Sequence, residues 1–420
     1  NNPPKIKLKT GKFIPVVLLS VLFLFPLSAS AQDQQPVPDT LEISNVNEAL
    51  DLAMKNNPQF QAAKLEADLK KSEVLGSLEI APLSLTYQKG QINSSVIDYN
   101  LSLEQNFGSI LKHIQTLKKY QMVKALNETE KLLRYRELNQ TISIAYNDWV
   151  YYSQISSLYQ LNIDIYNKYL QIAKLRFEAG EIDLLEKTIL EANYQKLVRD
   201  IRDAQIQRDK AKNILKKHLF IKDELKLSGI SYLKIPLEKE ESVIREELNE
   251  LFNVYYDLKT GITQQNLKIE KSSFFPEISA GYFNQQIDGA GGFEGWQAGL
   301  SFPIIFAPQH AKIKKAKVET ELENTQLSFQ KELFMSEIDN LFLELENKTL
   351  SINYFEDSAL KMADLLEKTA AKNYEKGETG YMEFIQSILE AKSIKIDYVN
   401  ASYERNKTVI KIKYLNPNSL

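Results

Sequence analysis

Two long stretches of the chain contain neither glycine nor proline: residues 109–179 and residues 309–376. Glycine and proline are the residues that most often interrupt or end helices, so we predict that each stretch is a single long helix. At about 1.5 Å per residue, a helix of near 70 residues is roughly 100 Å long. A helix of that length cannot lie inside a compact domain, and this constrains the fold more than any other feature of the sequence.

The sequence repeats one pattern at an offset of about 197 residues. The segment 177–181 matches the segment 374–378, and Glu186 matches Glu383 at the same spacing. Because the offset is the same for early and late matches, we interpret the chain as a duplication.

The two repeats are expected at about 41–220 and 241–415, with a connecting segment at 220–240. Each is predicted to begin with a helix and to continue with two strands, the very long helix, a glycine turn and a shorter return helix. In the first repeat, Asn57-Pro58 is expected to interrupt the first helix. The predicted first helices are residues 45–78 and 241–273, and the predicted return helices are residues 184–218 and 381–415.

Each repeat also contains a pair of short segments in which apolar residues alternate with small or polar ones, which is typical of strands. Turn-forming residues separate the members of each pair, at 93–95 and at 289–292. Four strands cannot close a barrel by themselves, whereas three copies of the chain supply about twelve. The sequence therefore predicts a mainly α fold with a small antiparallel β-hairpin part that closes only in a trimer. The predicted strands are residues 83–87, 97–103, 278–283 and 296–302.

Residues 1–31 have the composition of a targeting segment. Four lysines precede an apolar run at 13–27, and Ala29-Ser30-Ala31 provides a cleavage site. The run is shorter than the about 20 residues that a membrane-spanning helix needs. We predict a secretory signal peptide followed by an exported mature protein at 32–420, with an uncleaved anchor as the alternative. The chain does not begin with Met, and it fits either a processed fragment or the tail of a longer polypeptide.

Composition excludes several classes of function. The chain has no cysteine, so disulfides, thiol catalysis and cysteine-bound zinc are ruled out. Its net charge of −3 without a long run of one sign argues against nucleic acid as a partner. His113, His218 and His310 form no close pair, and no nucleophile elbow or phosphate loop is present. We therefore expect no metal, no cofactor and no enzymatic activity.

The duplicated turns and strand ends resemble the TolC-type outer-membrane efflux proteins. The residues that carry the resemblance are Phe177-x-x-Gly180, Tyr374-x-x-Gly377 and the segments 275–282 and 299–304. The resemblance covers essentially the whole mature chain, and it is greatest to members that work with heavy-metal or multidrug resistance-nodulation-division pumps. It implies a homotrimer in the outer membrane, with a TolC-like α-helical barrel that crosses the periplasm and continues a transmembrane β-barrel.

The resemblance also implies a function. The protein would be the outer-membrane exit duct of a tripartite efflux system, carrying small molecules or metal ions passively from an inner-membrane pump to the exterior. A periplasmic adaptor would join the two. Two alternatives remain open at this point: an outer-membrane duct for type I protein secretion, and a periplasmic coiled-coil scaffold anchored by an uncleaved N-terminal segment.

Within the family, acidic and tyrosine side chains narrow the lumen just beyond the turns. By position, this periplasmic aperture maps to Glu186, Glu383 and Tyr374, and Gln386 stands where an acid is common. Three copies would place each carboxylate in a ring that concentrates negative potential, although either glutamate could also simply solvate a helix face. The adaptor is expected to dock on the turns themselves, at Gly180, Glu181, Ile182, Gly377, Glu378 and Thr379.

Overall fold

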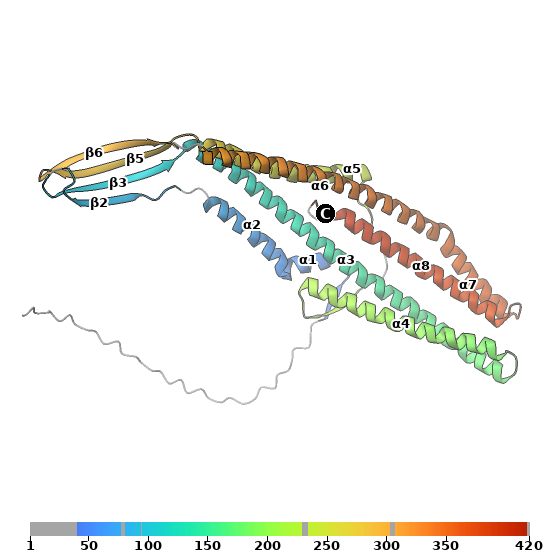
Figure 1. Ribbon diagram of the computed structural model, residues 1–420. Helices are drawn as coiled ribbons and strands as arrows, with labels where there is room; N and C mark the ends of the chain where they lie inside the picture. The colour runs from blue at the N-terminus through green and yellow to red at the C-terminus, as the bar shows by residue number, and fades with distance from the viewer. Residues whose placement is uncertain (1–39, 77–79, 94, 229–233, 303–306, 418–420) are drawn as a thin grey trace, which may run out of the picture. The chain divides into compact units, whose positions relative to one another are not determined.

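The computed structural model describes residues 40–76, 80–93, 95–228, 234–302 and 307–417 (Figure 1). The signal peptide predicted at 1–31 lies outside the described residues. The part of the chain from Thr40 onward forms one unit of long helices and strands.

The long helix predicted for the first repeat is confirmed, because α3 runs without interruption over Ile110–Glu178. Its 69 residues correspond to about 100 Å. The second long helix is interrupted, in that α6 (Ala307–Tyr354) and α7 (Leu360–Glu375) are separated by a π-helical turn, Phe355–Ala359. The two stretches begin at residues 110 and 307 and end at residues 178 and 375, so the repeat offset is the same at both ends.

The π-helical turn was missed because it contains neither glycine nor proline. A π turn inserts one extra residue into a helix, and such turns are often associated with functional sites. Here Glu356 accepts hydrogen bonds from the Lys234 ammonium (2.7 Å) and from the Tyr398 hydroxyl (2.8 Å). The turn thus ties the segment around Lys234 to the helix that carries Tyr398.

The shorter helices follow the prediction closely. The return helices are α4 (Leu184–Leu219) and α8 (Tyr381–Lys413), and the second repeat begins with α5 (Glu241–Ser272). The first repeat begins with two helices, α1 (Val46–Asn56) and α2 (Pro58–Gly76), which are broken at Asn57-Pro58.

Asn45 explains where α1 begins. Its side-chain oxygen accepts a hydrogen bond from the backbone amide of Glu48 at 3.0 Å, and the Glu48 carboxylate accepts one from the amide of Ser44 at 2.7 Å. These reciprocal bonds satisfy amides that have no partner inside the helix.

The four predicted strands form one antiparallel sheet in the order β2-β3-β5-β6. All four are longer than predicted, because the strand pairing continues into neighbouring polar residues and glycines that give no alternating pattern. β2 and β6 are the edge strands and pair on one side only within the described chain. The strands are β2 (Ser84–Gly90), β3 (Asp98–Gly108), β5 (Glu277–Ile287) and β6 (Ala290–Ser301).

The turn between β5 and β6 is shorter than the predicted segment 289–292. Only Asp288 and Gly289 form it, with φ of 52° and 74°. Two successive residues of positive φ define the tight hairpin turn whose twist matches that of paired strands. Residues 290–292 belong to β6, so the prediction that they form the turn was wrong.

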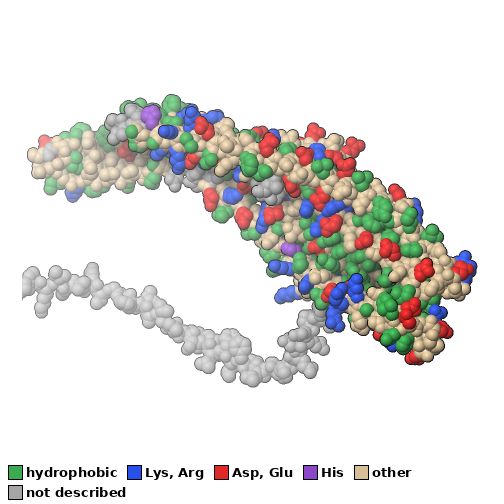
Figure 2. Space-filling view, turned by 45° about the vertical axis from the view of Figure 1, so that its right-hand side comes forward, with side chains coloured by type: hydrophobic (Ala, Val, Ile, Leu, Met, Phe, Trp, Pro, Cys, Tyr) green, Lys and Arg blue, Asp and Glu red, His purple; other side chains and the backbone are tan. Residues whose placement is uncertain are grey.

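The two faces of the sheet differ in character. One register row across the four strands consists of Leu85, Leu103, Tyr282 and Trp296. The next row points to the opposite face and consists of Thr86, Ser102, Phe283 and Gly295. Trp296 is 84% exposed, so the first face presents a large apolar surface. Each strand carries at most two charged residues, and Figure 2 shows charged side chains spread mainly over the helices.

A second, two-stranded sheet was not predicted. β1 (Thr40–Ile43) pairs in parallel with β4 (Glu224–Leu227), which lies in the connecting segment between the repeats. Ile43 and Leu225 are buried in a core that α1, α3 and α4 complete. Four-residue strands give too little alternation to be recognised in sequence.

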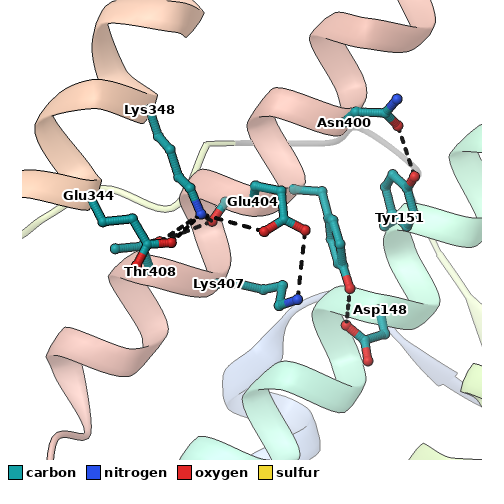
Figure 3. A network of polar contacts seen from close by, with 9 residues as sticks. Asp148, Tyr151, Glu344, Lys348, Asn400, Glu404, Lys407 and Thr408 are labelled. Carbon is teal, nitrogen blue, oxygen red and sulfur yellow. Dashed lines mark hydrogen bonds and ion pairs between the residues drawn. The ribbon is translucent and has the colours of Figure 1, made fainter. Parts of the chain in front are cut away.

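The buried residues form separate clusters along the helices, because helices of this length cannot share one centre. One cluster joins α1, α3 and α4, a second joins α5, α6 and α8, and a third lies beside the two glycine turns. A network of polar contacts also links α3, α6 and α8 (Figure 3). Tyr403 stacks on Tyr151 with ring centroids 4.0 Å apart, and its hydroxyl donates to Asp148 at 2.9 Å.

Candidate functional site at the two helix turns

The turns that end α3 and α7 have the same backbone geometry. At the first, the amide of Gly180 donates to the Phe177 carbonyl at 3.0 Å, and the amide of Glu181 donates to the Arg176 carbonyl at 2.8 Å. This pair of bonds is a Schellman motif, and the second turn repeats it at the equivalent positions. Gly180 and Gly377 have φ of 76° and 74°. Glycine adopts this left-handed backbone without strain, which explains why both repeats have it there.

The acidic residues assigned to the aperture lie in the first turns of the return helices. The Asp183 side chain caps α4 by accepting a hydrogen bond from the amide of Glu186 at 2.7 Å. Glu186 is half-buried, whereas Glu383, at the matching position of α8, is exposed. Gln386 follows Glu383 on α8 and is also exposed. A carboxylate near a helix N-terminus is stabilised by the helix dipole. This stabilisation is one reason for a glutamate at both positions 186 and 383.

Four aromatic side chains from three helices form what we call the aromatic junction: Tyr169 of α3, Tyr374 of α7, and Tyr381 and Phe384 of α8. Phe384 is 1% exposed. It stacks on Tyr374 with centroids 4.7 Å apart and meets Tyr169 edge-on at 4.6 Å. The Tyr381 hydroxyl donates to the backbone carbonyl of Tyr169 at 2.5 Å. The junction therefore fastens the α7–α8 hairpin to α3.

Tyr374 belongs to this junction rather than to the surface. The Arg176 guanidinium lies 5.0 Å from the centre of its ring and 3.6 Å from the Glu181 carboxylate. Burial raises the pKa of Tyr374, and Arg176 opposes that rise. Its buried hydroxyl has no hydrogen-bond partner within the described chain. Tyr374 is thus held by packing inside one chain, and its role at an aperture stays a prediction.

The surface around the first turn is more apolar than the sequence suggested. Leu184 and Leu185 begin α4, and Leu175 lies near the end of α3; they are 63%, 66% and 66% exposed. At the position that matches Leu184, the second repeat has Tyr381, which is buried. The sequence signal that could have marked this surface is the pair of adjacent leucines directly after the turn.

The residues assigned to adaptor docking surround the same turns. Glu181 is exposed, and Ile182 packs partly against the core beside the turns. Glu378 is exposed and lies 3.7 Å from the Lys376 ammonium. The Thr379 hydroxyl is buried without a hydrogen-bond partner in this part of the chain. The structure thus brings each set of docking residues together at its turn.

The repeat-related histidines lie next to the sheet and pack locally. A ring nitrogen of His113 is 2.7 Å from the Phe107 carbonyl, and the ring of His310 is 5.3 Å from that of Phe274. In the described residues, no group of three or more His, Asp or Glu side chains is arranged to hold a metal ion. None of the described helices combines the length and hydrophobicity needed to span a bilayer.

Comparison with known proteins identifies the fold. No family model matches the chain, and no curated protein matches its sequence. Solved structures do match. The outer-membrane channel OprN has a TM-score of 0.70 at 14% identity, with 88% of this chain and 89% of OprN covered. The CmeC outer-membrane channel of Campylobacter jejuni has a TM-score of 0.69 at 13% identity, with 88% and 84% covered.

CusC, whose structures describe transmembrane channel formation, has a TM-score of 0.67 at 14% identity, with 88% of this chain and 92% of CusC covered. At these identities the likeness establishes the fold. This chain has the fold of the TolC-type outer-membrane channels, and the predicted fold class, mainly α with a small antiparallel β part, is confirmed.

Proposed function

We propose that this protein is the outer-membrane exit duct of a tripartite efflux system. Small molecules or metal ions would pass through it from an inner-membrane pump to the exterior. The observation that carries the proposal is an open four-stranded sheet joined to a helix of about 100 Å, α3, in the fold of known outer-membrane channels.

The sheet supports a trimer. β2 and β6 leave unpaired backbone groups at both edges, and such edges pair with other strands unless they are covered. If β6 of one copy pairs with β2 of the next, three copies form a closed barrel of about twelve strands. The apolar row that contains Trp296 would face lipid, and the row that contains Thr86 and Ser102 would face water.

The helices would continue the barrel as a tunnel through the periplasm. α3 alone extends about 100 Å from the end of β3 to Gly180, so the glycine turns lie far from the membrane. A duct of this kind needs no cofactor and catalyses no reaction, because the partner pump supplies the energy. We propose that the adaptor docks at the turns, where Leu184 and Leu185 are exposed next to Glu181.

Glu186 and Glu383 would form the aperture. In a trimer each residue is present three times, so the narrow mouth would be lined by two rings of carboxylates. Rings of this kind favour cations and hold them when the charges lie close together. Gln386 adds no charge, which limits the negative potential of the mouth.

Recordings from planar lipid bilayers test the proposal. The purified wild type should give small, cation-selective currents that divalent cations block. Glu186→Gln with Glu383→Gln should weaken both the selectivity and the block. Glu390→Gln is a matched control, because Glu390 is exposed on α8 beyond Glu383. If the wild type forms no pore at any voltage, the duct is refuted; if the double variant behaves like the control, only the carboxylate rings are refuted.

Two further measurements separate the alternatives. Deletion of the gene should sensitise cells to a metal or drug if the protein serves efflux, and it should abolish export of a protein if it serves secretion. Membrane fractionation separates the duct from a periplasmic scaffold, because only the duct is recovered with the outer membrane.

A further inference from the structure

The two long helices begin with strongly basic segments. Residues 110–127 of α3 and 307–318 of α6 contain four lysines each and no aspartate or glutamate, although the whole chain has a net charge of −3. Both segments closely follow the sheet, since β3 ends at Gly108 and β6 ends at Ser301. We call these eight side chains the basic collar: Lys112, Lys118, Lys119, Lys124, Lys312, Lys314, Lys315 and Lys317.

Helix stability does not explain these lysines. The helices α1, α4, α5 and α8 each have a glutamate in the first turn, where the helix dipole favours a negative charge. Neither α3 nor α6 has an acidic residue in its first turn, and α3 has Lys112 there. A cation at this end of a helix is unfavourable, so the position of Lys112 points to a partner of opposite charge.

Most of the collar is exposed and has no carboxylate partner. Seven of the eight lysines are exposed, and Lys119 is half-buried. Lys315 and Lys317 lie 3.6 and 3.9 Å from glutamates one turn later on α6. Figure 2 shows Lys and Arg side chains on the helices next to the sheet. The collar lysines that are exposed and form no ion pair within the described residues are Lys112, Lys118, Lys312 and Lys314.

Side chains of the collar also line a groove beside α5. The groove has a volume of about 500 Å³, and four lysines and two glutamates contribute to it, so its net charge is positive. The Thr116 hydroxyl and the Asn266 amide line it as well and add hydrogen-bond donors. Ammonium, hydroxyl and amide donors together suit a phosphate group. The charged residues of the groove are Lys112, Lys119, Lys312, Lys315, Glu270 and Glu319.

The collar lies at the level of the lipid headgroups if the sheet spans the outer membrane, and in this respect the inference rests on the proposed function. Strands β5 and β6 have 11 and 12 residues. At about 3.3 Å per residue and a tilt of about 45°, they span about 26–28 Å, close to the roughly 30 Å of a hydrocarbon core. Lys112 and Lys312 lie about 3 and 8 Å along their helices, within a headgroup layer about 5–8 Å thick.

We propose that the basic collar binds anionic phospholipids of the leaflet that faces the periplasm. The headgroup phosphate accepts hydrogen bonds from the lysine ammoniums, and the negative charge of the lipid balances lysines that have no carboxylate partner. An apolar surface for the acyl chains adjoins the collar, because Phe107 at the end of β3 and Ile110 at the start of α3 are 45% and 56% exposed. The bound lipids would fix the depth of the sheet in the membrane.

Quenching of tryptophan fluorescence by brominated lipids tests the proposal. Trp296 is 84% exposed on the apolar row of the sheet, whereas Trp149, the other tryptophan, is 4% exposed on α3 and gives a constant background. The full-length protein is reconstituted into phosphatidylcholine vesicles that contain brominated phosphatidylglycerol or brominated phosphatidylcholine. A lysine next to an anionic headgroup favours binding about fivefold, so brominated phosphatidylglycerol should quench equally at about one-fifth of the mole fraction. Added salt should reduce this preference.

Two variants of equal charge locate the effect. The first replaces the four unpaired collar lysines by glutamine, and it should quench equally with both lipids. These side chains are exposed and form no ion pair in the described chain, so their replacement should leave the fold intact. The second is a control that replaces four exposed lysines outside the collar, also without ion pairs in the described chain, and it should keep the preference. Its substitutions are Lys168→Gln, Lys196→Gln, Lys210→Gln and Lys368→Gln.

The outcomes separate the collar from the duct. Equal quenching by the two lipids in the wild type, or an unchanged preference in the collar variant, would overturn the collar, while quenching of Trp296 would still place the sheet in lipid. A loss of preference in the control as well would show that overall charge attracts the lipid, and it would also overturn the collar. No quenching by either lipid would overturn both the collar and the proposed function.

Discussion

Replacing Phe384 by alanine should loosen the aromatic junction and leave the rest of the chain folded. Phe384 is 1% exposed and contacts the rings of Tyr374 and Tyr169 at centroid distances of 4.7 and 4.6 Å. Truncating a buried phenylalanine to alanine costs about 3–5 kcal/mol. Because about 1.4 kcal/mol corresponds to a tenfold change in an equilibrium constant, local opening should become at least about 100-fold more frequent.

Amide hydrogen exchange followed by mass spectrometry measures this opening. Peptides from 370–388 and from 166–173 should exchange about 100-fold faster, while peptides of α5 should be unchanged. Phe334→Ala is the matched control, because Phe334 is 0% exposed and stacks on Phe252 at 5.4 Å in a different cluster. Equal acceleration along the whole chain, or none near the turns, would refute the idea that the junction fastens the hairpin locally.

Two further predictions concern stability. Gly377→Ala should lower the free energy of unfolding by about 1 kcal/mol, since φ is 74° and no atom lies within 4 Å of the added carbon, so that only backbone strain contributes. Gly377→Asn should lose less than Gly377→Ala, because asparagine tolerates the left-handed backbone, and equal losses in a denaturant titration would contradict this reasoning. Hydrogen bonding from Lys234 lowers the pKa of Glu356 below its usual 4.5. The folded-state pKa is therefore below the unfolded one, so the ionised carboxylate stabilises the fold above about pH 4.5, and this contribution disappears as the pH falls through the folded pKa. Glu356→Gln should flatten the acid limb of stability plotted against pH, and an unchanged slope would contradict the assignment.

Much of the architecture could be predicted from the sequence because it depends on local signals. The absence of glycine and proline from residues 110–178 allows a helix of 69 residues, and Gly180 marks where it ends. The side chain of Asn45 caps α1 at the position where the polar residues suggested a start. Because the two repeats are offset by about 197 residues, a helix or strand predicted in one repeat is also expected at the equivalent position of the other.

The missed features depend on contacts between residues that are distant in sequence. Glu356 is held by Lys234 and Tyr398, and the π-helical turn around it gives no compositional signal. β1 exists because β4, more than 180 residues later, pairs with it. For the candidate site, the turns and their first helical residues were found from the repeat. The aromatic junction was not, because Tyr169 and Phe384 meet only when the two hairpins pack together.

Disulfide cross-linking tests the central claim, a closed trimer, most directly. The chain has no cysteine, so a cysteine at Leu85 on β2 and one at Trp296 or Ala298 on β6 would be the only thiols. Within one chain, β3 and β5 separate these edges by about 14 Å, which is too far for a disulfide. Oxidation in outer membranes should therefore join different copies, and the ladder of products should end at three. A ladder that continues beyond three copies, or no product at any register, would contradict the closed trimer.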